Sequence, residues 1–106
     1  CFIGEIIAKK EYNIYDKDIL NAIRYHTTGR EAMSLLEKIV YIADIIEPSR
    51  NFEGVDKIRE LAYKDLDKSI LYAINSTIKF VIDRGKLIHL DTIKARNHLL
   101  ILEDLE

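Results

Sequence analysis

The chain has 106 residues, 48% of them apolar, which is enough for one hydrophobic core and too few for two ordinary domains, so a single domain over residues 1–106 is expected. Sixteen basic residues against eighteen acidic ones leave a net charge of −2, without the basic excess that a nucleic-acid partner requires. Cys1 is the only cysteine, so a reducing, cytoplasmic setting without an internal disulfide is expected. No apolar run approaches the roughly 20 residues that span a bilayer, which argues against a membrane-embedded protein.

The apolar residues recur at helical spacing, and nowhere do they alternate over a stretch long enough for a strand. Six helices are expected: over about residues 2–10, from Asp16 or Asp18 to the Thr27-Thr28-Gly29 stop, over 35–46, over 55–63, from Asp65 or Asp67 to Gly85, and from Asp91 or Thr92 to about 102. Ser34 and Glu37 have the spacing of a capping box, and Pro48 cannot continue the helix that they open. The sequence therefore predicts an all-α architecture.

Asp44 is the most unusual residue, because apolar residues surround it on nearly every side of the helix expected over 35–46. A helix that is apolar all round is usually buried, and a buried ionised carboxylate is costly unless it is paired or bound to a metal. Two explanations stay open from the residues alone. Asp44 either forms an ion pair or cap with a neighbouring helix, or it is a metal ligand.

His26 lies at the expected end of the second helix, where an imidazole is favoured by the helix dipole or is aimed into a cleft as a metal ligand. The following Thr27, Thr28 and Gly29 offer hydroxyls and a close-approach backbone, which suit a phosphate oxygen and equally suit an ordinary loop. Both interpretations remain open for this segment.

Guanidinium groups match phosphate oxygens bidentately, and each also serves as a solvated surface charge or a salt-bridge partner. The arginines nearest to these groups in the sequence are Arg24, Arg30, Arg50 and Arg96. Two further histidines, His89 and His98, have neither ligand spacing nor an apolar setting and are interpreted as structural or surface residues.

Three ordered runs carry a family resemblance: AIRYHTTG at 22–29, Met33-Ser34, and KIVYIADIIEPSR at 38–50. The order and spacing continue through 52–55, 61–62, 65–67, 88–89 and 92–97. Together these stretches, within about residues 4–100, closely resemble the second half of the YqeK family, the bacterial symmetrical diadenosine tetraphosphatases of the HD superfamily.

The resemblance implies an HD-domain helical bundle with a divalent transition metal, expected to be iron, and hydrolysis of diadenosine tetraphosphate to two ADP. In that family the aspartate of the Ala-Asp-x-Ile-Glu-Pro stretch is a metal ligand and the histidine of the His-Thr-Thr-Gly stretch lines the metal centre, which implies those roles for Asp44 and His26. Substrate-binding positions, with a nucleotide as ligand, fall by the same resemblance on Thr27, Thr28, Gly29, Arg50 and Arg96.

The sequence departs from the family pattern in one respect, because it contains no His-Asp dipeptide and no earlier histidine ligand. Residue 1 is also not a methionine, and the first expected helix has no cap ahead of it. We therefore expect a C-terminal portion of a longer enzyme, lacking its N-terminal helices. Other interpretations are an HD hydrolase of another nucleotide and, for these residues alone, a non-catalytic helical module that binds a nucleotide or a partner. Apolar residues in excess of one small core would permit a homodimer.

Overall fold

The computed structural model describes residue 10 and residues 16–104 of the chain. Five helices follow one another within 16–104: α2 (Lys17–Tyr25), α3 (Leu35–Ile46), α4 (Val55–Lys64), α5 (Leu66–Asp83) and α6 (Leu90–Asp104). The described residues contain no strand, so the predicted all-α fold is confirmed. The first expected helix lies, apart from helical Lys10, outside the described residues.

The helix boundaries follow from local capping. Ser34 and Glu37 form the predicted capping box, in which the Ser34 hydroxyl accepts from the backbone N–H of Glu37 at 3.2 Å and the Glu37 carboxylate accepts from that of Ser34 at 3.3 Å. Asp16 caps α2 and Asp65 caps α5. Helix α6 begins at Leu90, one residue before the predicted start, and the His89 side chain accepts from the backbone N–H of Asp91 at 3.1 Å.

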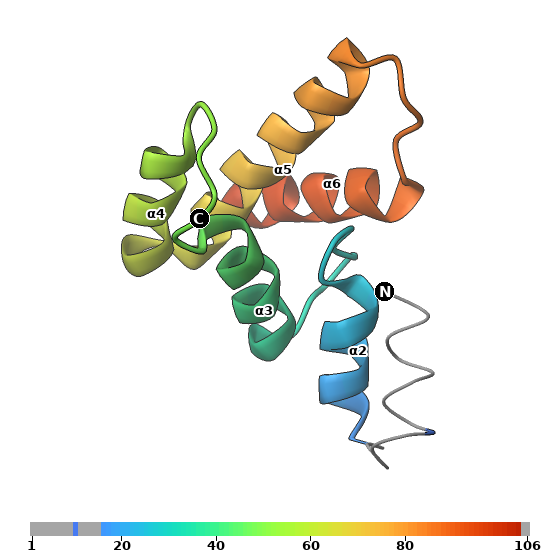
Figure 1. Cartoon of the computed structure of the whole chain (residues 1–106). Helices are drawn as coiled ribbons and strands as arrows, with labels where there is room; N and C mark the ends of the chain where they lie inside the picture. The colour runs from blue at the N-terminus through green and yellow to red at the C-terminus, as the bar shows by residue number, and fades with distance from the viewer. Residues whose placement is uncertain (1–9, 11–15, 105–106) are drawn as a thin grey trace.

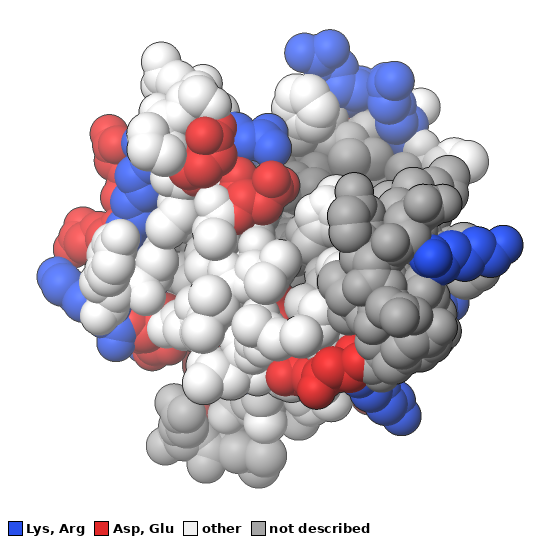
Figure 2. All heavy atoms as spheres, turned by 60° about the horizontal axis from the view of Figure 1, so that its bottom comes forward, with Lys and Arg blue, Asp and Glu red and all other residues white. Residues whose placement is uncertain are grey.

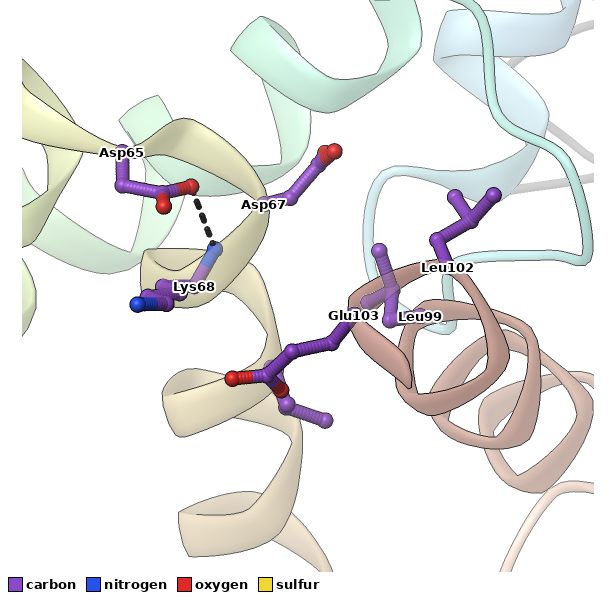
Figure 3. A pocket seen from close by; sticks show the side chains of 7 residues that line it. Asp65, Asp67, Lys68, Leu99, Leu102 and Glu103 are labelled. Carbon is purple, nitrogen blue, oxygen red and sulfur yellow. Dashed lines mark hydrogen bonds between the residues drawn. The ribbon is translucent and has the colours of Figure 1, made fainter. Parts of the chain in front are cut away.

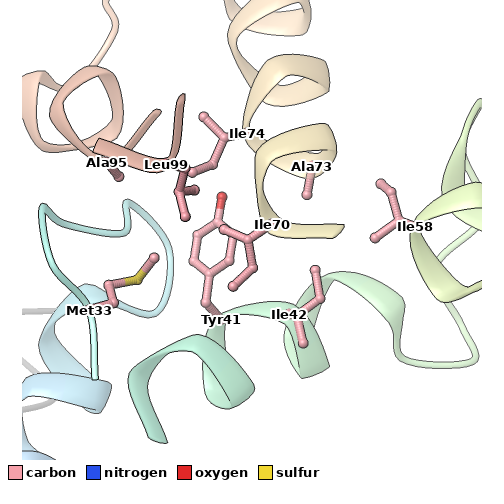
Figure 4. Packing of buried hydrophobic residues seen from close by; sticks show 9 residues of the cluster. All are labelled: Met33, Tyr41, Ile42, Ile58, Ile70, Ala73, Ile74, Ala95 and Leu99. Atoms are coloured by element: carbon pink, nitrogen blue, oxygen red, sulfur yellow. The ribbon is translucent and has the colours of Figure 1, made fainter. Parts of the chain in front are cut away.

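Helix α5 is the central element, because it packs against α3, α4 and α6, while α2 packs against α3 (Figure 1). The core lies between these helices, where Tyr41 and Ile42 of α3 meet Ile58 of α4 and Ile70 of α5 (Figure 4). Ile58 and Ile70 have no exposed surface, and burying a side chain of this size stabilises the fold by about 1.5–3 kcal/mol. The core therefore fixes α3 and α4 against α5.

The helices bury only part of their apolar residues. Leu20 and Ala22 of α2 are buried, whereas Ile19 is 41% exposed. Helix α3 is not buried all round, since Ile39 is 46% exposed and Ala43 is also exposed. None of the described helices is long and apolar enough to cross a membrane.

Charges are mixed on the surface. On the face in Figure 2, uncharged side chains occupy the centre, and basic and acidic side chains lie around them. This mixture agrees with the small net charge of −2.

Candidate functional site

Asp44 lies in the last turn of α3, at an open hollow between α3, the loop that follows it and α5. The hollow has an empty volume of about 750 Å³ including the solvent at its mouth, and it is lined by Asp44, Ile45, Arg50, Phe52, Ala73, Ser76, Thr77 and Phe80. The Asp44 side chain is 44% exposed, so the predicted burial of this carboxylate is wrong. Asp44 borders the hollow and is not part of the packed core, which leaves its carboxylate partly accessible.

Arg50 faces the same carboxylate. Its Nη2 donates to Asp44 Oδ2 at 3.3 Å, and its Nε lies 3.9 Å from Glu47 Oε1. The Arg50 side chain is 50% exposed, so these are surface ion pairs, which contribute little to stability. The arrangement leaves a cation and a carboxylate side by side in the hollow, both accessible to a ligand.

The turn that carries Arg50 is held by Arg59 of α4, a residue that the sequence analysis did not single out. Arg59 Nε donates to the Ile46 carbonyl oxygen at 3.1 Å, and its Nη2 donates to the carbonyl oxygens of Glu47 at 3.1 Å and Arg50 at 2.7 Å. Carbonyl groups at a helix C-terminus lack intrahelical partners, and a guanidinium with several N–H donors satisfies them. Arg59 thereby fixes the exit of α3 and the backbone of Arg50.

Glu47 and Ser49 close the same turn. The Ser49 hydroxyl donates to Glu47 Oε1, and this hydrogen bond holds the pKa of the exposed Glu47 carboxyl below its ordinary value. The backbone N–H of Arg50 also donates to the Glu47 carbonyl oxygen at 2.9 Å. The Glu47-Pro48-Ser49-Arg50 stretch is therefore an ordered turn that presents Arg50 toward Asp44.

His26 follows the last residue of α2 and is half-buried. Its Nδ1 lies 2.7 Å from the carbonyl oxygen of Ile23. When Nδ1 carries the proton and donates to this carbonyl, Nε2 is left as the acceptor. A backbone carbonyl on one ring nitrogen is a common way to orient a histidine that binds a metal through the other.

The residues after His26 form a compact loop against α6. Thr92 Oγ1 donates to the Thr28 carbonyl oxygen at 2.9 Å, and Thr28 Oγ1 donates to the Gly29 carbonyl oxygen at 3.0 Å. Gly29 has φ +71°, and a Cβ placed on it would meet Ala95 Cβ at 3.4 Å. These contacts show that the loop is tightly built, while Thr27 is exposed.

Arg96 lies in a second hollow, between α5 and α6. This hollow is lined by Asn75, Ile78, Lys79, Ile88, Ile93 and Arg96. Arg96 Nε donates to Asn75 Oδ1 at 2.7 Å. The structure thus brings Asp44 and Arg50 together but places Arg96 in a different hollow, and the segment from His26 to Gly29 lines neither of the two.

A third, smaller hollow lies between the start of α5 and the end of α6 (Figure 3). Two of its charged side chains already have structural partners. Asp65 accepts from the backbone N–H of Lys68 at 3.1 Å as the cap of α5, and Asp67 pairs with Lys38 at 2.8 Å. We assign no chemistry to this hollow.

Two of the predicted site residues are candidate donors for a metal ion. Within the part of the chain that the structure describes, no three His, Cys, Asp or Glu side chains are grouped so that they could hold a metal. Asp44 offers an exposed carboxylate and His26 an oriented imidazole, which are suitable donors for a divalent transition metal. Each side chain suits one position of a ligand set, but His26 does not line the hollow of Asp44, and two donors do not complete a set because a catalytic metal usually has three protein ligands.

No protein-family model matches the chain. The chain is similar to a solved structure from Clostridium acetobutylicum, which is described as a predicted HD superfamily hydrolase involved in NAD metabolism. The two sequences are 57% identical, and the structures superpose with a TM-score of 0.91. The match covers 93% of this chain and 52% of the Clostridium chain. The fold is therefore that of the HD-superfamily hydrolases.

Two curated relatives are similar to this chain over most of its length. Proteins named symmetrical bis(5'-nucleosyl)-tetraphosphatase from Bacillus subtilis and Halalkalibacterium halodurans are 43% and 46% identical over 98 residues, which is 92% of this chain. The chain spans 53% and 52% of their lengths, about half in each case. The resemblance to the symmetrical tetraphosphatases that the sequence motifs predicted is thus confirmed over 92% of this chain.

Proposed function

We propose that this chain is part of a metal-dependent phosphohydrolase that cleaves diadenosine tetraphosphate symmetrically into two ADP molecules. The observation that carries the proposal is the pair formed by Asp44 and Arg50 at one open hollow, in a chain 43–46% identical to proteins named for this activity. Metal-assisted phosphoryl transfer needs a carboxylate that binds a metal cation and a positively charged group that binds the phosphate. A carboxylate next to a guanidinium provides both.

Asp44 and His26 would hold the metal, which we propose to be iron. When bound, such an ion lowers the pKa of a coordinated water toward neutrality and supplies a nucleophile. The further ligands are expected in the half of the relatives' length that this chain does not span. His26 is suited to its role because, when Nδ1 donates to the Ile23 carbonyl oxygen 2.7 Å away, Nε2 is left as the acceptor.

Arg50 would neutralise the negative charge that develops on the phosphate oxygens. Such charge stabilisation is often worth several kcal/mol in an active site, and it requires that the donor be fixed before the substrate arrives. The three backbone contacts from Arg59 provide that fixation. The partly exposed rings of Phe52 and Phe80 line the same hollow and could stack on an adenine base.

Thr27, Thr28 and Gly29 remain predicted substrate contacts. Their support is the ordered loop that Thr92 ties to α6, which presents backbone groups and the exposed Thr27 next to His26. Arg96 occupies a separate hollow.

The proposal is tested with Asp44→Asn in the full-length protein, with Asp67→Asn as the matched control. Asp67 pairs with Lys38 at the start of α5 and lines a different hollow, so its loss should leave activity unchanged. Asp44→Asn should reduce both metal content and ADP release by about 100-fold or more, since even residues that only orient metal ligands are worth about 10–100-fold. Unchanged metal content and turnover in Asp44→Asn would refute the assignment.

The substrate and the setting are also proposals. A panel of nucleoside monophosphates, cyclic nucleotides and dinucleoside polyphosphates would distinguish the tetraphosphatase from an HD hydrolase of another nucleotide. We further propose that the protein acts in the cytoplasm without a nucleic-acid partner, in agreement with its lone cysteine and its net charge of −2. A homodimer remains a prediction, supported by the exposed apolar side chain of Ile82 in α5.

A further inference from the structure

Arg96 is a half-buried arginine without an ion pair to any carboxylate among the described residues. Arg30, which is similarly half-buried, is paired with Glu37. Arg96 instead uses its Nε to donate to the neutral Asn75 Oδ1 at 2.7 Å. This single bond fixes the guanidinium plane but leaves its charge uncompensated and its Nη atoms available to an anion.

The residues around Arg96 indicate which kind of anion it can bind. Lys79 contributes a second cation, and no carboxylate residue lines the hollow. The remaining wall is apolar and is formed by three half-buried isoleucines, Ile78, Ile88 and Ile93. A pair of cations next to an apolar wall fits a phosphate group that is attached to an uncharged, flat or apolar body, as in a nucleoside phosphate.

Helix α5 separates this hollow from the one that holds Asp44. Asn75, Ile78 and Lys79 face the Arg96 hollow, whereas Ala73, Ser76, Thr77 and Phe80 face the Asp44 hollow. At 100° per residue these two sets lie on opposite sides of the helix, whose diameter with side chains is about 10–12 Å. A phosphate bound to Arg96 is therefore not the phosphate bound next to Asp44.

We propose that Arg96, oriented by Asn75 and assisted by Lys79, forms a second binding site for a nucleoside phosphate, separate from the Asp44 hollow. The site binds a ligand and performs no chemistry of its own. It is independent of the proposed hydrolysis, because its binding partners are all outside the Asp44 hollow.

The test is a calorimetric titration of the full-length, metal-loaded protein with ADP, which the proposed hydrolysis forms and does not consume. Two ADP sites per chain are expected. Arg96→Gln should weaken one of them by about tenfold or more, because a charge-assisted hydrogen bond is lost, and Arg50→Gln should weaken the other. Asn75→Ala should weaken the Arg96 site as well, since the guanidinium is no longer oriented.

Two controls keep the outcome interpretable. Lys94→Gln removes an exposed cation from the same helix that lines neither hollow, and it should leave both sites unchanged. Arg96→Lys keeps the charge, so it should retain ADP binding in part and shows whether loss in Arg96→Gln is merely unfolding. Titration with inorganic phosphate and with adenosine separates the two parts of the ligand, and each should bind more weakly than ADP.

The proposal is overturned if Arg96→Gln and Asn75→Ala bind ADP like the parent, whether one or two sites are found, or if Arg50→Gln abolishes all ADP binding. Failure of the diadenosine tetraphosphate assay would not affect this test, because the titration measures ADP binding and not hydrolysis. The two proposals thus fail separately.

Discussion

Replacing Arg59 with alanine should loosen the turn that carries Arg50 and so impair the proposed site from a distance. The side chain is 31% exposed and donates to three backbone carbonyls, those of Ile46, Glu47 and Arg50. Hydrogen bonds of this kind contribute about 1 kcal/mol each, and water can replace part of them here. We therefore expect a loss of about 2 kcal/mol in the free energy of unfolding.

In a protein of the relatives' length, about twice that of this chain, that loss corresponds to a fall in Tm of about 4–8 °C by differential scanning calorimetry. The Arg50 guanidinium would also lose its fixed backbone, so kcat/KM for diadenosine tetraphosphate should fall by about tenfold, with Arg59→Lys intermediate. Arg59 contacts no ligand in this account and acts as a positioning residue.

The matched control for Arg59→Ala is Asp56→Asn. It removes the ion pair between Arg59 Nη1 and Asp56 Oδ1 at 3.5 Å while leaving the carbonyl contacts in place. Because Asp56 is 97% exposed, this change should alter neither Tm nor kcat/KM measurably. The reasoning would be refuted if Arg59→Ala behaved like Asp56→Asn in both measurements.

Two further predictions concern groups in and around the core. Burial raises the pKa of Tyr41 to about 12, although a hydrogen bond with Thr77 acts in the opposite direction. The unfolded chain therefore ionises Tyr41 near pH 10, before the folded protein does. Tyr41 thus adds stability that is fully present below about pH 10 and is lost as the pH rises toward 12. Urea unfolding between pH 9 and 12 should show a steeper alkaline loss in the parent than in Tyr41→Phe, and identical slopes would contradict this. Glu37 is 1% exposed and pairs with Arg30 at 2.6 Å, which raises the pKa of Arg30. Glu37→Ala should therefore destabilise the fold by about 3 kcal/mol, measured by the shift of the urea midpoint, and a shift like that of an ordinary surface mutation would count against it.

The helices were predictable because their ends are encoded locally. Ser34 and Glu37 are three residues apart and satisfy each other's backbone, which places the start of α3 at Leu35 as expected. Gly85, with φ +65°, follows the end of α5 as a residue without a Cβ should. The start of α6 was missed by one residue because His89, interpreted as a surface residue, supplies a side-chain acceptor next to the helix start.

The setting of Asp44 was harder to predict. The apolar residues around it suggested a buried helix, yet a helix buries only the faces that its neighbours cover, and here Tyr41 and Ile42 are covered while Ile39 is not. An ion pair with a neighbouring helix was left open among the alternatives, and the structure forms an ion pair at 3.3 Å with Arg50 of the loop that follows α3. Arg59 gave no sequence signal, because its partners are backbone carbonyls that any residue provides.

The central claim is tested most directly by the products that the full-length protein makes from diadenosine tetraphosphate, separated by ion-exchange chromatography. The account predicts ADP alone, two molecules for each substrate consumed, with loss of activity in Asp44→Asn and not in Asp67→Asn. ATP and AMP in equal amounts would mean asymmetric cleavage, and no hydrolysis by a metal-loaded protein would mean another substrate; either result would contradict the proposed function.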